Sequence, residues 1–287
     1  MDLLLQILAN GILLGGLYAL MALGLALVWG VLNIVNLAHG AFIMLGGYVT
    51  WYLFSVAGVD PFVALPVTAV AMFAFGYAIQ RGVLNLVIRS PMFNTLLITF
   101  GLEVVFEYLA QTLFSADFRT INPTYAGASF TLGPVTFPAV QLAAFAIAVG
   151  LTVAMWLFLL HARAGRAIRA AAQNLVAARL YGVHPARIYA FTFGLGAALA
   201  GVAGGLYGMV SQLNPYIGGP LTAKSFVIAI IGGLDNPLGV IVGGLALGVI
   251  ESLTSLYVGP TYRDVASFGI LVLVLIVRPT GLLGRTA

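Results

Sequence analysis

The chain has 287 residues, of which 62% are hydrophobic and only 7% are charged, and its formal net charge is +4. A soluble domain carries about 25% charged residues, so this chain cannot cover a water-facing surface and most of it must be solvated by lipid. The absence of cysteine from the sequence excludes disulfides and thiolate metal sites, and the basic residues fall in short loops between apolar segments, a pattern of membrane insertion rather than of nucleic-acid binding.

The apolar segments predict an all-α integral membrane protein, because backbone groups in hydrocarbon must be satisfied within the chain itself. At roughly 20 residues per span, the sequence has room for about eight or nine transmembrane or partly spanning helices in a single domain, residues 1–287. The first segment lacks the basic start of a cleaved signal and is too long for one, so we expect it to stay as a span. The expected segments are 3–29, 38–56, 61–80, 93–115, 139–160, 188–210, 222–234, 238–258 and 265–277.

A polar break separates the first two segments. The stretch "WGVLNIVNLAHGAFIMLGGY" places Asn33, Asn36 and His39 between apolar runs, and such a break is tolerated only where it is buried in protein or lines a cavity. Asparagine near a helix start often satisfies free backbone groups, which favours capping and pinning of a helix junction. Lining of a translocation path is the alternative. No second histidine or acid stands nearby at ligand spacing, so no metal site is predicted.

Three acidic residues fall inside apolar segments. Glu103 and Glu107 are four residues apart on one helix face, and Glu251 lies in "GVIESL". Intramembrane carboxylates are costly and often functional, which raises the alternative of a proton-coupled secondary transporter that uses one of them. The other interpretations are a bond across helices for Glu251 and, for Glu103 and Glu107, a position facing another subunit or nearer the membrane interface.

The basic residues predict the orientation of the loops. If all nine segments cross, nine arginines fall on one side and three basic residues on the other. The positive-inside rule then places the C-terminus inside, and the N-terminus and the 116–138 loop outside. The segment 222–234 is too short for a straight span, so we expect a broken or re-entrant helix, and whether it crosses decides the side of the C-terminus. The inside set is Arg81, Arg89, Arg163, Arg166, Arg169, Arg179, Arg187, Arg278 and Arg285, and the outside set is Arg119, Lys224 and Arg263.

The most polar stretch is "HARAGRAIRAAAQNLVAARLYGVHPAR", residues 161–187, with five arginines and two histidines. Its pattern predicts one short amphipathic helix that Gly182 ends, with Pro185 just beyond and Arg179 on the apolar side. The polar face is expected to hold Arg166, Arg169 and Gln173, and the apolar face Ile168, Ala172 and Leu175. Such a helix could rest on anionic headgroups or dock in a groove of a cytoplasmic partner; the residues leave both open.

Glycine is frequent, with 35 residues, and clusters at 194–208 and 239–248. Small residues at such spacing let helix backbones approach closely in lipid, which predicts tight packing. A role in sliding helices during gating does not follow from the spacing. A weak echo between "NLAHGAFIMLGG" and "NPLGVIVGG" would suit a repeat architecture with broken helices around a central path.

Four stretches together resemble one family. "GRAIRAAAQNLVAARLYGV" resembles the cytoplasmic loop of permeases from ABC importers of branched-chain amino acids. "NIVNLAHGAFIMLGGY", "GGLDNPLGVIVGGLALGVIES" and the terminal "RPTGLLG" resemble three other signatures of the same permeases. The four lie in register, so the resemblance covers essentially the whole chain, whose length resembles the shorter of the two permease subunits. Glu103 and Glu107 depart from the pattern, since a small polar residue is expected there.

The resemblance implies a type II-like ABC importer permease fold in the bacterial inner membrane, working by alternating access. It implies a second permease as partner, expected as a heterodimer, together with two cytoplasmic ATPases and a periplasmic binding protein. The residues that match the ATPase-docking loop are Gly165, Arg166, Arg169, Ala170, Asn174, Ala178 and Gly182. Branched-chain amino acids are the expected substrates, and relatives also move urea, short amides and aromatic acids.

No Walker A pattern occurs in the sequence. The chain is therefore expected to have no ATPase site and no cofactor of its own, with ATP bound by the partner subunits. It also contains no nucleophile elbow and no His-Glu zinc motif, so we expect it to be no enzyme.

Overall fold

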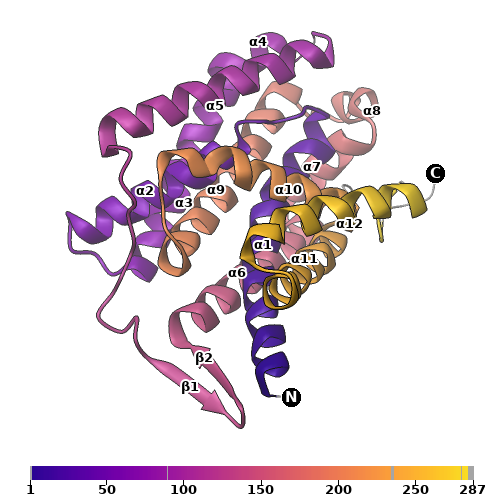
Figure 1. The fold of residues 1–287 in the computed structure, drawn as a ribbon. Helices are drawn as coiled ribbons and strands as arrows, with labels where there is room; N and C mark the ends of the chain where they lie inside the picture. Colours follow the sequence, from indigo (N-terminus) through magenta and orange to yellow (C-terminus); the bar gives the residue numbers. More distant parts are fainter. Residues whose placement is uncertain (1, 89, 234–235, 279, 284–287) are drawn as a thin grey trace.

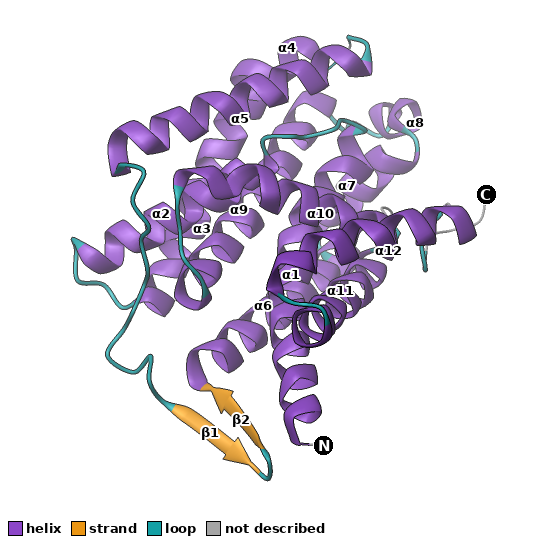
Figure 2. Ribbon diagram, viewed as in Figure 1, coloured by secondary structure: helices purple, strands orange, loops and turns teal. Residues whose placement is uncertain are grey.

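The computed structural model describes residues 2–283 except 89, 234–235 and 279, and it is mainly helical (Figures 1 and 2). In the described part of the chain, each of the nine predicted apolar segments contains one helix, which confirms the expectation of an all-α membrane protein. These helices are α1 (Asp2–Leu32), α2 (His39–Ser55), α3 (Pro61–Ile79), α5 (Met92–Phe114), α6 (Ala139–His161), α9 (Pro185–Val210), α10 (Gly218–Gly232), α11 (Pro237–Tyr257) and α12 (Arg263–Val277). Seven of these regions are long and apolar enough to cross a membrane, whereas α2 and α10 have only 17 and 15 residues.

Shorter elements occupy the connections. A π-helical turn η1 (Gln80–Leu84) and α4 (Asn85–Val87) extend α3, and α7 (Arg163–Gln173) and α8 (Leu175–Leu180) lie between α6 and α9. The 3₁₀ turns η2 (Pro215–Ile217) and η3 (Pro260–Tyr262) precede α10 and α12. β1 (Ser129–Leu132) and β2 (Val135–Pro138) form an antiparallel hairpin, with Ser129 opposite Pro138 and Leu132 opposite Val135. The sequence patterns did not predict this hairpin.

Helix α1 lies at the centre of the bundle. It is apolar on every side, as expected of a helix surrounded by others, and residues 17–28 are all buried. α1 packs against α6, α9, α10 and α11, whereas α2 and α3 pack against α9. Gly15 lies so close to α11 that an added Cβ would stand 2.7 Å from the Cα of Leu245, and Gly46 of α2 meets Gly201 of α9 with equally little room. The tight packing predicted for the glycine clusters is therefore confirmed.

The loops gather at two opposite ends of the molecule. Figure 1 shows α4, α7 and α8 at one end, and the N-terminus and the hairpin at the other; following the predicted orientation, we call these the inner and outer ends. Leu213, just after α9, exchanges two backbone hydrogen bonds of 2.8 Å with Arg119 of the 116–138 loop. α11 runs antiparallel to α1, with Gly248 beside Gly11, so it starts toward the inner end. The stretch 211–232 therefore runs from the outer end toward the inner end, and the helix within it, α10, has 15 residues.

The outer loop, residues 116–138, is tied down by several parts of the chain. The side-chain oxygen of Gln6 accepts a hydrogen bond of 2.7 Å from the Thr136 amide, and its Nε2 donates to the Thr136 carbonyl at 2.8 Å. The Tyr125 hydroxyl donates to Asp60 Oδ2 at 2.7 Å. Burial, followed by this hydrogen bond and the charge of Asp60, raises the pKa of the Tyr125 hydroxyl well above its ordinary value.

Candidate translocation path and coupling loop

The polar break after α1 is residues 33–38. Asn33 has a φ of +52°, a left-handed conformation that asparagine tolerates better than most residues, and its amide donates to the Trp29 carbonyl at 2.9 Å. It thus ends α1, and its side chain is exposed. The expected role near a helix start does not apply to Asn33, because it lies at the C-terminal end of a helix.

Two threonines from distant helices satisfy the backbone of the break. The hydroxyl of Thr99 on α5 accepts a hydrogen bond from the Leu37 amide at 3.2 Å and lies 3.0 Å from the Val35 carbonyl. The hydroxyl of Thr222 on α10 accepts from the Gly40 amide at 2.7 Å and donates to the Leu37 carbonyl at 3.0 Å. The start of α2 therefore meets the first turns of α10, and the junction is held by residues that the sequence analysis missed. A hydroxyl in an apolar helix is the only sequence signal for them.

Asn36 and His39 are both buried, with 1% of each exposed. His39 Nε2 lies 2.9 Å from the carbonyl of Met21, so the first residue of α2 is pinned to the middle of α1. Asn36 Oδ1 has no hydrogen-bond partner among the described residues, and Ala38, the N-cap of α2, makes no side-chain cap. For His39 this geometry favours a structural role at the helix junction over lining of a path. It does not decide between the two roles for Asn36.

The inner loop, residues 161–187, forms two helices rather than the single helix expected. α7 ends at Gln173, and Asn174 adopts an extended conformation with φ −155°. Its side-chain oxygen then accepts from the Ala177 amide at 2.9 Å and caps α8. The single-helix prediction was wrong because asparagine at this position competes for the backbone and starts a new helix. Gly182, with a φ of +83°, ends the pair as expected.

The base of the inner loop is fixed to α6. Gly165 packs on the last turns of α6, where an added Cβ would stand 2.7 Å from the Cα of Leu159. Arg169 Nη2 donates to the Leu160 carbonyl at 3.1 Å and Arg166 Nη1 to the His161 carbonyl at 3.4 Å. Cations at a helix C-terminus satisfy free carbonyls and complement the helix dipole. The two arginines therefore join α7 to the end of α6.

The tip of the inner loop is apolar and exposed. Ile168 and Ala178 are buried, as are Gly165 and Ala171, whereas Ala172, expected on the apolar face, is exposed. Beyond Asn174, three large side chains are strongly exposed, namely Val176 (70%), Leu180 (84%) and Tyr181 (88%). The sequence analysis missed these three, although their apolar character within a polar stretch was a signal. Exposed aromatic and aliphatic side chains of this kind are typical of surfaces that contact another protein or a membrane.

A charged network lies toward the outer end, between α1, α10, α11 and α12. Lys224 Nζ lies 2.9 Å and 3.1 Å from the two oxygens of Glu251 and 3.3 Å from Asp264 Oδ1. The hydroxyls of Tyr18 and Ser267 donate to Glu251 at 2.8 and 2.7 Å. Glu251 therefore bonds to other helices, as expected from the sequence. Its pairing with Lys224 was not expected, because Lys224 was used only to predict the orientation.

Glu103 and Glu107 are half-buried on α5, and neither takes part in a salt bridge within the described residues. Glu103 faces the first turn of α10, since a Cβ added at Gly219 would stand 3.4 Å from Glu103 Oε1. The Glu103 side chain therefore lies beside the N-terminus of α10, and these contacts assign no transport role to either glutamate.

Comparison with known proteins gives a consistent result. A family model described as "Branched-chain amino acid transport system / permease component" matches residues 7–275. The permease protein LivH of the high-affinity branched-chain amino acid transport system of Escherichia coli (strain K12) is 35% identical, with 98% of this chain and 96% of LivH covered. The corresponding permease BraD of Pseudomonas aeruginosa is 34% identical, with the same coverage. The permease LivM of E. coli K12 is 27% identical, with 94% of this chain and 68% of LivM covered. No solved structure matches the chain.

Proposed function

We propose, from the premise that the chain belongs to the family of permease components of branched-chain amino acid transport systems, that it is the shorter permease subunit of an ABC importer. The chain covers nearly all of LivH and BraD but only 68% of LivM, which supports the assignment as the shorter subunit. Branched-chain amino acids, the solutes named for these relatives, are the proposed substrates, moved across the inner membrane.

The partners follow from the two ends of the molecule. A second permease of the longer type pairs with this chain in the membrane, and a binding protein delivers the solute at the outer end. Two ATPases dock at the inner end and bind the ATP, because this sequence contains no phosphate-binding loop of the Walker A type. The chain itself carries no cofactor and performs no chemical reaction.

The observation that carries this proposal is the exposed apolar tip of the inner loop. Leu180 and Tyr181 are 84% and 88% exposed at the end of the molecule that the arginines mark as cytoplasmic. Leu180 is the last residue of α8 and Tyr181 is its C-cap, and an exposed aliphatic and aromatic pair suits insertion into a pocket of a partner. Contact with lipid headgroups also suits the arginines of this loop, and copurification of ATPase subunits distinguishes the two environments.

The base of the inner loop suggests how force reaches the membrane helices. Arg166 and Arg169 hold α7 to the C-terminal carbonyls of α6, and Gly165 lets the two helices touch. Movement of the docked ATPases would therefore be passed first to α6 and then to α1, against which α6 packs. Alternating access follows when this motion closes the path on one side of the membrane and opens it on the other.

The test is uptake by the purified assembly. The tagged full-length chain, isolated from its native membrane, should bring ATPase subunits with it. In proteoliposomes the assembly should take up leucine only with ATP, and vanadate should stop uptake while an uncoupler has no effect. Uptake that continues without any ATPase, or that an uncoupler abolishes, would instead support proton coupling through Glu103, Glu107 or Glu251, which no observation favours at present.

A further inference from the structure

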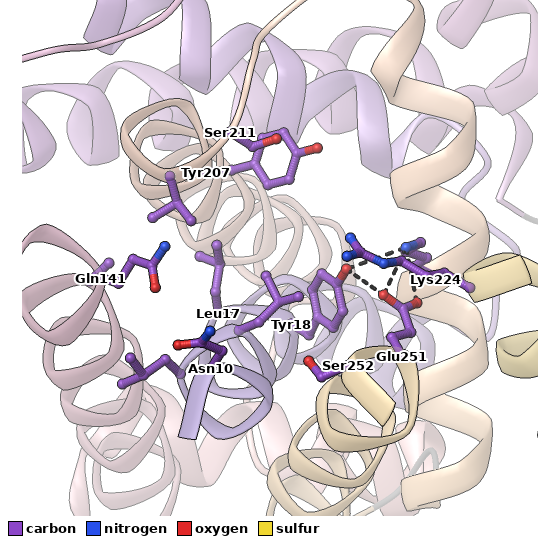
Figure 3. Close-up of a pocket in the computed structure, with 14 residues that line it drawn as sticks. Asn10, Leu17, Tyr18, Gln141, Tyr207, Ser211, Lys224, Glu251 and Ser252 are labelled. Atoms are coloured by element: carbon purple, nitrogen blue, oxygen red, sulfur yellow. Dashed lines mark hydrogen bonds and ion pairs between the residues drawn. The ribbon is translucent and has the colours of Figure 1, made fainter. Parts of the chain in front are cut away.

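We propose that the cavity beside Lys224 is a binding site for the zwitterionic head of an α-amino acid. The solute class rests on the proposed function, whereas the site itself rests on the geometry. The cavity has a volume of about 340 Å³ and is lined by residues of α1, α6, α9, α10 and α11 and by the first residue of α12 (Figure 3). This is within the range of about 300–1,000 Å³ that small-molecule sites occupy.

A second cavity of about 340 Å³ is lined in part by the same residues. The two cavities share Tyr18, Tyr207 and Lys224, so the ammonium group of Lys224 borders both. Burying a lysine within a membrane-spanning bundle costs free energy, and such residues usually have a function. Lys224 lines both cavities, so a solute bound in either one lies beside this residue.

The walls of the first cavity divide into an apolar and a polar part. Leu13, Leu14 and Leu17 come from one face of α1, and they suit the side chain of a branched-chain amino acid. Gln141, Ser211 and Ser252 supply amide and hydroxyl groups on other helices (Figure 3). A cavity with one apolar wall and a few convergent polar groups is the usual form of a site for a small amphipathic ligand.

The charges around Lys224 are balanced. Two cations, Lys224 and Arg263, and two anions, Glu251 and Asp264, border one or both cavities. A zwitterion brings one charge of each sign, so it can exchange partners with this set without leaving a net charge buried. A purely cationic or anionic solute would leave an unmatched charge.

The two anionic partners of Lys224 differ in how firmly they are held. Glu251 is 1% exposed and is also bound by Tyr18 and Ser267, whereas the Asp264 side chain is 67% exposed. Asp264 is therefore the partner that a solute carboxylate displaces from Lys224. The freed Asp264 carboxylate then receives the ammonium group of the solute.

The experiment uses the absence of cysteine from this sequence. Ser211→Cys places a thiol in the wall of the cavity, and Ser129→Cys on the exposed hairpin is the matched control. The assembled importer is held in lipid nanodiscs and treated with a methanethiosulfonate reagent, and the mass of this chain reports labelling. At ten times its Kd, leucine should slow labelling of Cys at 211 about elevenfold, because occupancy protects in proportion to 1 + [L]/Kd, and should leave the control unchanged.

Two analogues separate the parts of the ligand. Leucinamide lacks the carboxylate and 4-methylpentanoate lacks the ammonium group, so neither should protect at the same concentration. Equal protection by either analogue, a lack of leucine protection, or a thiol at 211 that the reagent never reaches would each overturn the site.

A double variant separates ligand binding from helix packing. Lys224→Met with Glu251→Gln removes both charges together, which avoids leaving one of them buried and unpaired. The assembly should still form and Cys at 211 should still react, but leucine should no longer protect. Full protection in the double variant would show that the ion pair only joins helices.

Leucine uptake by the unmodified assembly distinguishes the two proposals. Uptake without protection leaves the proposed function in place and overturns the site, whereas protection without uptake supports the site and overturns the proposed function.

Discussion

The outer loop and the inner loop are similar in length but are held in opposite ways. Residues 116–138 are bonded to distant parts of the chain, to Gln6, Asp60 and Leu213. The side chains of residues 161–187 bond mainly within the loop or to the adjoining end of α6. The outer loop is thus held by contacts within this chain, whereas the inner loop ends in an exposed apolar tip.

The two loops therefore differ in the contacts that stabilise them. A surface loop bonded to several helices keeps its shape in the isolated chain. The apolar tip of the inner loop is not covered by the described chain, and in the proposed assembly an ATPase would cover it. We therefore predict that substitutions at the tip of the inner loop act on assembly and transport, whereas substitutions that remove the bonds of the outer loop act on its local stability.

The largest effect is expected at the inner tip. Leu180→Ser together with Tyr181→Ser should lower leucine uptake and ATPase copurification by more than about tenfold, since a buried anchor residue contributes about 2 kcal/mol or more to an interface. Both side chains are exposed in the chain alone, so its thermal unfolding should not change. The matched control is Phe130→Ser with Leu132→Ser on the hairpin, where two side chains are 63% and 76% exposed. Equal loss of ATPase in both pairs would break the comparison.

The next effect is expected at the base of the inner loop. Gly165→Val forces α7 away from α6, because the added Cβ would stand 2.7 Å from the Leu159 Cα, and overpacking of this kind costs about 1–3 kcal/mol. Uptake should fall several-fold and thermal unfolding should shift downward. Gly127→Val in the outer loop is the control, since a Cβ there meets nothing within 4 Å. A stable and active Gly165→Val variant would contradict the proposed rigid joint.

A smaller effect is expected at the junction of α7 and α8. Asn174→Ala removes the bond to the Ala177 amide, and loss of an N-cap costs about 1 kcal/mol. Hydrogen exchange of the α8 amides should speed up, with a modest loss of uptake. Asn122→Ala, which removes an exposed bond to Thr120 in the outer loop, should leave uptake unchanged. Unaltered exchange in α8 would show that the cap is not what holds this helix.

The smallest effect is expected at Tyr125. Its hydroxyl pKa is raised in the folded chain, so the bond to Asp60 is fully present below the ordinary tyrosine pKa of about 10 and is lost as the pH rises through the folded value. Tyr125→Phe should cost about 1 kcal/mol or less at neutral pH and should remove this pH dependence. Thermal unfolding between neutral and strongly alkaline pH measures both. A Phe variant that loses stability at high pH as the parent does would assign the effect to another group.

The helices could be predicted from the sequence because each apolar run reports a local property of the chain. The nine segments and the close glycine contacts follow from composition and spacing alone. The break in the inner loop is also local, but asparagine occurs within helices as well as at helix caps, so the pattern predicted one helix through Asn174.

The contacts at the candidate sites could not be predicted because they join residues far apart in the sequence. Thr222 meets Leu37 and Gly40, and Glu251 meets Tyr18, across most of the chain. Nothing in the spacing of Asn33, Asn36 and His39 showed that hydroxyl groups from α5 and α10 would hold the break. Lys224 likewise indicated only the orientation of the loops, because its partners Glu251 and Asp264 lie on other helices and could not be predicted.

The paired backbone bonds between Arg119 and Leu213 have a mechanical consequence. They join the outer loop, residues 116–138, to the segment around Leu213, which leads through η2 into α10. A displacement of the 116–138 loop would therefore be passed through Leu213 to α10 and to Lys224, which α10 carries.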